Sequence, residues 1–141
     1  MTDYQKGHHA LQIFEMGESP RNLKIWIFAS IAWILFGLFF AWHYSIARWV
    51  VGCWVAGVMS LVAANYIFKS VLFRLSGFLA LTHVVFWSPS LYMLLTERPF
   101  LASDVTPYSI WSGGVTAIFL FSYIFDIPYS FVYLKHVFFR K

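Results

Sequence analysis

Three polar residues interrupt the apolar runs of this 141-residue chain and are the candidates for chemistry: Asn65, His83 and Asp126. A polar side chain within the hydrocarbon region of a bilayer is costly, so each of them needs a partner or a function. A carboxylate can hold a cation or exchange a proton, and an imidazole can exchange a proton or ligate a metal or haem. These three residues therefore define the polar path that any transport function would use.

Asp126 lies in the aromatic segment SYIFDIPYSF, at the end of the last apolar run. At that depth it would lie beside Asn65 and close to Lys69 and Arg74. The interpretation that we favour is an anchor, in which Asp126 pairs with Arg74 or Lys69 or accepts a hydrogen bond from Asn65. An ion pair at the interface fixes the helix register without the full cost of burial. The alternative is a proton or cation site at the mouth of a path.

His83 lies near the middle of the third apolar run. Two axial histidines of a b-type haem would have to lie at similar depths on different helices, and none of the other four histidines matches. These are His8, His9, His43 and His136. We therefore expect a hydrogen-bonded packing residue and no cofactor or metal. A single bond from His83 to haem or to a pigment stays open as an alternative.

Motifs of known enzymes are missing from the sequence, which contains no HExxH, GxSxG or phosphate-binding loop. Cys53 is the single cysteine, which excludes an intrachain disulfide and a CxxC site. We therefore predict that the chain is not an enzyme.

The composition indicates a membrane protein. Hydrophobic residues make up 60% of the chain, aromatic residues 22% and charged residues 11%, whereas soluble domains carry roughly 25% charged residues. The net charge of +4 does not indicate a nucleic-acid partner, because the basic residues lie at the ends of apolar runs. The expected partner is the lipid bilayer.

Four apolar runs are long enough to cross a bilayer as helices, which takes about 20 residues. The predicted fold is all-α: an integral membrane four-helix bundle that forms one transmembrane domain over residues 1–141. The predicted helices cover residues of about 23–43, 48–68, 74–95 and 107–126.

Two Ser/Thr-Pro pairs predict where helices begin. Ser19-Pro20 and Thr106-Pro107 each combine a capping hydroxyl with a proline suited to the first helical position. They mark the start of the first and fourth helices.

Both ends of the chain are predicted to lie at the membrane interface. Residues 10–16 suit a short surface helix, and the tail 129–141 suits an amphipathic interfacial helix. Pro128 would be the bend at which the fourth helix leaves the membrane.

The basic residues predict the orientation, since lysine and arginine favour the cytoplasmic side. Eight lie on the side of the two termini, against Arg48 and Arg98 on the other. Both termini are therefore predicted to be cytoplasmic, in an inner-membrane protein. Tyrosine and tryptophan, including Tyr108 and Trp111, would form the outer aromatic belt.

Small residues at four-residue spacing predict helix–helix seams, because helices in lipid associate through close backbone contact. The seams would close this chain's own bundle or receive another subunit. The seven residues are Gly52, Ala56, Ser60 and Ala64 in the second helix, and Ser109, Gly113 and Ala117 in the fourth.

Three functions remain, in this order. The first is an accessory, assembly or stabilising subunit of a larger membrane complex, bound to other integral membrane proteins or to copies of itself. The second is a small transporter or channel component that uses Asp126, His83 and Asn65. The third is a pigment- or haem-associated membrane subunit.

Overall fold

The computed structural model describes residues 14–15, 19–68 and 74–139. Over these residues the regular elements are helices, apart from one pair of two-residue strands. In chain order the elements are β1 (Phe14–Glu15), α2 (Arg21–Phe36), α3 (Leu38–Ala41), α4 (Ser45–Phe68), β2 (Arg74–Leu75), α5 (Gly77–Glu97), the 3-10 helix η1 (Pro99–Leu101) and α6 (Pro107–Phe138).

Four helical stretches of the described chain are long and apolar enough to cross a membrane. The prediction of an all-helical chain with four such helices is therefore confirmed. The first two lie within three residues of the predicted bounds, and the third runs six residues past its predicted end at residue 95. The stretches are Arg21–Ala41, Ser45–Ile67, Gly77–Leu101 and Pro107–Phe138.

The fourth helix is longer than predicted. α6 runs without interruption through Pro128 to Phe138, so the predicted end at residue 126 and the separate tail over 129–141 are wrong as far as residue 138. Proline removes one backbone donor, but transmembrane helices tolerate this where hydroxyl side chains supply other bonds. Beside Pro128, the Ser130 hydroxyl donates to the backbone carbonyl of Asp126 at 2.6 Å.

The segment before α2 pairs with the link between α4 and α5. β1 lies antiparallel to β2, with Phe14 opposite Leu75 and Glu15 opposite Arg74. The predicted surface helix over residues 10–16 is therefore wrong at residues 14 and 15, and its other residues lie outside the described chain. A helix of only seven residues is marginal in water, whereas pairing supplies backbone partners directly.

Both predicted helix starts are confirmed in position, since α2 begins directly after Pro20 and α6 begins at Pro107, and one of the two predicted caps is confirmed. Thr106 caps α6: its hydroxyl accepts from the Ser109 amide at 3.1 Å, and the Ser109 hydroxyl accepts from the Thr106 amide at 2.8 Å. Pro107 occupies the first turn of α6. At α2 the capping residue is Pro20, without a side-chain cap, so the predicted cap by Ser19 is wrong.

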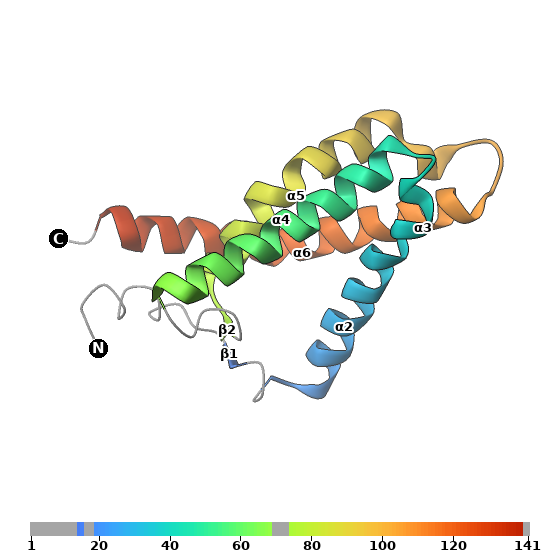
Figure 1. Cartoon of the computed structure of the whole chain (residues 1–141). Coiled ribbons are helices and arrows are strands. Elements are labelled where there is room, and N and C mark those ends of the chain that lie inside the picture. The colour runs from blue at the N-terminus through green and yellow to red at the C-terminus, as the bar shows by residue number, and fades with distance from the viewer. Residues whose placement is uncertain (1–13, 16–18, 69–73, 140–141) are drawn as a thin grey trace.

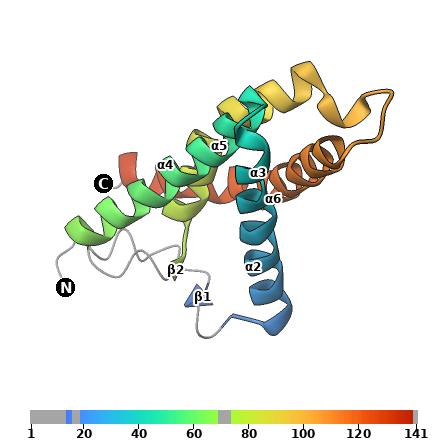
Figure 2. The ribbon, with the colours of Figure 1, turned by 45° about the vertical axis from the view of Figure 1, so that its right-hand side comes forward.

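Three helices form a layer, and the fourth crosses it. α5 packs against both α4 and α6. α2 meets α6 and α4 near its carboxyl end, and its first half diverges from the layer (Figures 1 and 2).

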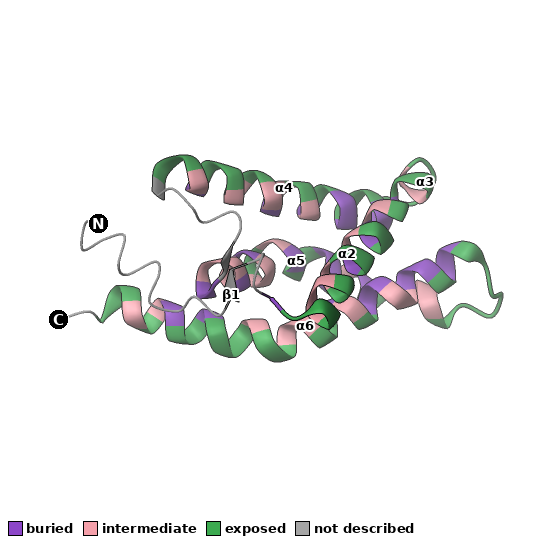
Figure 3. Cartoon of the chain, turned by 90° about the horizontal axis from the view of Figure 1, so that it is seen from below, coloured by how far each residue is buried: buried purple, intermediate pink, exposed green. Residues whose placement is uncertain are grey.

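The hydrophobic core lies toward the end of the bundle that carries α3. Figure 3 shows buried positions in the part of α4 next to α3 and in the first half of α6. Packing at this end therefore holds all the helices together, while the first half of α2 diverges from the others. The buried cluster consists of Ile34, Ile46, Ala47, Val50, Trp87, Leu91, Leu94, Tyr108, Trp111, Val115 and Phe119.

Two predicted members of the outer aromatic belt belong to this core instead. Trp111 is 1% exposed and Tyr108 is 9% exposed. The Tyr108 ring stacks on Tyr44 with ring centroids 3.7 Å apart, and Phe40 packs beside both Tyr108 and Trp111. These rings connect the α3–α4 turn to the start of α6.

Candidate functional site

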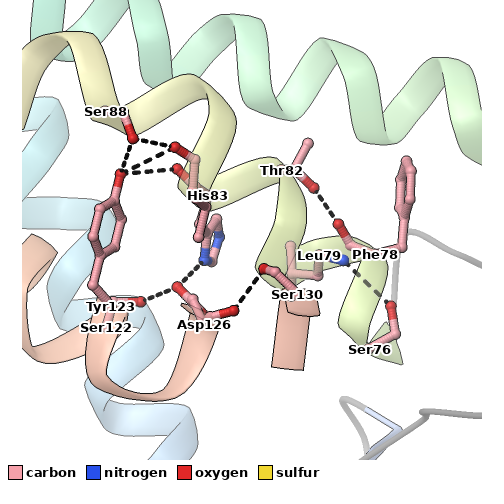
Figure 4. A network of polar contacts seen from close by, with 11 residues as sticks. Ser76, Phe78, Leu79, Thr82, His83, Ser88, Ser122, Tyr123, Asp126 and Ser130 are labelled. Atoms are coloured by element: carbon pink, nitrogen blue, oxygen red, sulfur yellow. Dashed lines mark hydrogen bonds and ion pairs between the residues drawn. The ribbon is translucent and has the colours of Figure 1, made fainter. Parts of the chain in front are cut away.

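His83 and Asp126 form a hydrogen-bonded pair between α5 and α6. The imidazole Nδ1 lies 2.9 Å from Asp126 Oδ2. The same carboxylate oxygen accepts a hydrogen bond from the Ser122 hydroxyl at 2.6 Å. Figure 4 shows the carboxylate between these two groups. Ser122 lies four residues before Asp126 on α6, so both face the same side of the helix.

The pair exists because α6 continues past Asp126. Since α6 ends at Phe138, Asp126 lies well inside the helix, roughly 18 Å from that end at 1.5 Å per residue. His83 is similarly inside α5, which begins at Gly77. From the sequence, Asp126 is expected at the helix end and His83 deeper in the membrane. That expectation is wrong, because the two side chains are in direct contact.

The described bonds of Asp126 come from residues other than its predicted partners. Lys69 lies outside the described residues, and Arg74 is described only as the backbone of β2. Asn65 lies on α4 and is not among the described residues that line the cavity beside the pair. Among described side chains, Asp126 is bonded by His83 and Ser122. The described bonds of Asp126 therefore support an anchoring function through α5.

Aromatic stacking fixes the orientation of the His83 ring. It stacks on Trp87 with centroids 4.1 Å apart, and Trp87 stacks on the buried Phe119 of α6 at 4.5 Å. An ionised Asp126 can only accept, so the 2.9 Å contact assigns the proton to Nδ1. In the neutral imidazole Nε2 then carries a lone pair that can accept a proton or a hydrogen bond.

Tyr123 connects the same two helices one turn away. Its hydroxyl lies 3.0 Å from the Ser88 hydroxyl, and it donates toward the carbonyls of Val84 at 3.2 Å and His83 at 3.4 Å (Figure 4). Ser88 also donates to the Val84 carbonyl. These bonds lie just before Pro89, within the turn whose hydrogen bonding the proline disrupts.

A cavity of about 810 Å³ lies between the diverging half of α2 and the layer of α4, α5 and α6. His83, Ser122 and Asp126 form the polar part of its α5–α6 wall. An edge-to-face contact between Trp26 and Phe121 joins the α2 wall to the α6 wall. Most of the lining is apolar or aromatic, so the polar groups stand out as fixed points for a ligand.

Ser30 is the polar group on the α2 wall. It is 9% exposed, lines the cavity, and its hydroxyl has no hydrogen-bond partner in the described chain. Helical serines and threonines commonly donate to the carbonyl four residues earlier. Thr82, Thr116 and Ser130 do so here, at 2.7, 2.8 and 2.6 Å. The hydroxyl of Ser30 is therefore available to a ligand.

The small residues of the predicted seams are divided between buried and exposed positions. Ala64 and Ser109 are buried, Ala56, Ser60 and Gly113 are half-buried, and Gly52 and Ala117 are exposed. The buried side of α6 is displaced by about one residue from the predicted seam. It includes Tyr108, Trp111, Val115 and Phe119. Contact of the exposed positions, Gly52 and Ala117, with another subunit stays a prediction.

Sequence reasoning missed Ser122 and Ser30. The spacing of Ser122 from Asp126 was readable, because residues four apart share a helix face. Ser30 gave no such signal, since its importance depends on the missing hydrogen bond and on the divergence of α2.

Within the described residues no group of three or more His, Cys, Asp or Glu side chains is placed to hold a metal ion. No protein-family model, curated protein or solved structure matches the chain.

Proposed function

We propose that this chain is a multi-pass inner-membrane protein that holds a small amphiphilic solute in the cavity beside α2, as a transporter or channel component. The observation that carries the proposal is the His83–Asp126 pair on the wall of a cavity of about 810 Å³. Ligand cavities typically measure about 300–1,000 Å³ and combine apolar walls with a few polar groups. The geometry favours this function over the accessory subunit, which ranked first from sequence alone.

The location of the cavity supports transport from one side. Pro20, Asn22 and Ser76 line it, and they lie at or next to the first turns of α2 and α5. In the predicted orientation these are the cytoplasmic ends. The packed core closes the other half of the bundle, near α3. A solute would therefore enter from the cytoplasmic half and meet His83 and Asp126 before it reaches the core.

The proposal is tested by identifying the small molecules that stay bound to the protein during purification. The tagged protein is purified from its native membrane in mild detergent, and bound small molecules are identified by native mass spectrometry. We expect a stoichiometric solute in the wild type and its loss in Ser30→Leu, which fills the cavity. Ala117→Leu is the control, because it enlarges an exposed small residue of α6. Failure to retain any solute, or equal retention by Ser30→Leu, would contradict the proposal.

The accessory-subunit function is the second candidate, and one surface favours it. A groove of about 550 Å³ between α4 and α5 is lined by Trp49, Gly52, Ala56 and Phe86, among others. Its small residues would allow another helix to approach closely. Stoichiometric proteins that co-purify with the wild type but not with Gly52→Trp would support this function. A lone chain or homo-oligomer that moves solutes in liposomes would support transport.

The pigment or haem hypothesis is tested by an absorption spectrum of the same preparation. Bands beyond the aromatic region that disappear in His83→Gln would support it, and their absence would remove it.

A further inference from the structure

The charges around the cavity restrict what it can hold. Among the described residues that line it, Asp126 is the one carboxylate, His83 is the one imidazole, and none is lysine or arginine. With a neutral imidazole this lining carries one negative charge. A carboxylate in an apolar surrounding is costly unless an opposite charge or good hydrogen bonds compensate it.

We propose that the cavity binds a lipophilic organic cation, with Asp126 as its counter-charge. This inference rests on the proposed function and adds the chemical class of the solute. The carboxylate accepts two hydrogen bonds from neutral donors, His83 and Ser122, and these leave its charge in place. A bound cation supplies the missing positive charge.

The aromatic side chains of the cavity walls also suit an organic cation. Trp26 and Phe121 meet edge to face at the cavity, and Trp87 forms part of the α5 wall. Aromatic faces attract organic cations, and the attraction grows when water is excluded. An anionic amphiphile would face the Asp126 carboxylate without a lysine or arginine of the described lining to offset it.

Ser30 adds a second contact from the opposite element. Its buried hydroxyl has no partner among the described residues, so it can accept from an N–H of the ligand or donate to a ligand oxygen. A ligand held between Ser30 on α2 and Asp126 on α6 would also connect the diverging helix to the layer.

Protons compete with the cation for the pair. Protonation of His83 places a positive charge 2.9 Å from Asp126, which satisfies the carboxylate without a ligand. The described titratable lining groups are His83 on α5 and Asp126 and Tyr129 on α6, and α2 and α4 contribute none. Tyr123 adds a hydroxyl bonded at the backbone of His83. A protonated His83 therefore opposes binding of a cation, and a neutral His83 permits it.

Two ions of matched size test the charge selectivity. Tetraphenylphosphonium and tetraphenylborate have the same shape and opposite charge. Binding to the purified protein in neutral detergent is followed by quenching of Trp26, Trp54 and Trp87, which line the cavity. We expect saturable quenching by the phosphonium only. Asp126→Asn removes the counter-charge and should weaken binding of the phosphonium by about tenfold or more. Asp104→Asn is the control, because it removes an exposed acid elsewhere.

Each outcome decides the proposal. Equal affinity for the two ions, tighter binding of the borate, or unchanged phosphonium affinity in Asp126→Asn would overturn the cation assignment while the cavity function stands. If Asp126→Asn does not fold, binding of the two ions is compared between the wild type and Ser30→Leu. That variant keeps the His83–Asp126 pair intact. Quenching by neither ion overturns the cation assignment. If, in addition, native mass spectrometry shows that Ser30→Leu retains the native solute, the proposed function fails as well.

Discussion

Trp33 and Trp111 exchange hydrogen bonds across two helices. The indole N–H of Trp33 donates to the backbone carbonyl of Trp111 at 3.1 Å, and the indole N–H of Trp111 donates to the carbonyl of Trp33 at 2.9 Å. This reciprocal pair joins the second half of α2 to the beginning of α6, and the first half of α2 diverges from the layer (Figure 2). It therefore sets the crossing on which the cavity depends.

Two glycines make this exchange sterically feasible. A Cβ at Gly37 would lie 2.4 Å from the Trp111 ring, and a Cβ at Gly114 would lie 2.2 Å from the Trp33 indole nitrogen. We predict that Gly37→Ala or Gly114→Ala lowers the free energy of unfolding by about 1–3 kcal/mol, as overpacking does. Thermal unfolding in detergent measures the effect.

Gly52→Ala is the matched control for these substitutions. It lies within α4, and nothing lies within 4 Å of the added Cβ. Alanine should leave stability unchanged or raise it by up to about 1 kcal/mol, because glycine is the poorer helix former. A loss at Gly52 equal to that at Gly37 would contradict the assignment of the effect to contact with the tryptophans.

The tryptophan exchange itself predicts coupling. Trp33→Phe removes one donor and keeps an aromatic ring, and Trp111→Phe does the same in the core. Interhelical hydrogen bonds in membrane proteins contribute about 0.6 kcal/mol on average. Since each indole bonds the backbone beneath the other, we expect the double substitution to differ from the sum of the single ones. A double-mutant cycle on unfolding free energies measures this, and strict additivity would contradict coupling.

Sequence patterns sufficed for the four helices because each apolar run is long enough to cross a bilayer. They failed where a local signal had to be weighed against tertiary contacts. Pro128 indicated a helix end, yet α6 continues, with the Ser130 hydroxyl bonded beside the proline. The depth of Asp126 was inferred from that false end, so His83 was not recognised as its partner.

The cavity and the tryptophan exchange had no readable signal. Trp33 and Trp111 are 78 positions apart, and nothing in their spacing indicates that they meet. The divergence of α2 follows from where α2 crosses α6, which depends on the space left by Gly37 and Gly114. Such contacts depend on three-dimensional packing and not on periodicity.

Asp126 variants test the strength of the α5–α6 pairing. Asp126→Asn keeps an oxygen that can accept from His83 or Ser122, so we expect a loss of about 1 kcal/mol. Asp126→Leu leaves the His83 N–H without its acceptor, at a cost of about 1–3 kcal/mol. Thermal unfolding and cellular abundance measure both. Normal abundance of Asp126→Asn with complete loss of function would show that the carboxylate serves the solute and is more than an anchor.

Tyr123→Phe removes the hydroxyl that bonds Ser88 and the carbonyls before Pro89. The phenyl ring keeps its packing, so the loss should be that of one hydrogen-bonding group, about 0.5–1.5 kcal/mol. Tyr92→Phe is the control, because Tyr92 is 70% exposed on the same helix α5 as Ser88. An equal effect of the two substitutions on the unfolding midpoint would indicate that the Tyr123 hydroxyl does not connect the helices.

The orientation in the membrane is tested by reporter fusions. Eight of the ten lysines and arginines are predicted to lie on the side of the two termini: Lys6, Arg21, Lys24, Lys69, Arg74, Lys135, Arg140 and Lys141. By the positive-inside rule, fusions after Ser70 and after Lys141 should report cytoplasm, and fusions within residues 100–105 should report the outside. As a control, Arg48→Ala and Arg98→Ala remove the two opposing charges and should leave this pattern unchanged. Two of the four helices, α5 and α6, lie between Ser70 and Lys141, so both fusions should report the same side. Reports from opposite sides would contradict four crossings.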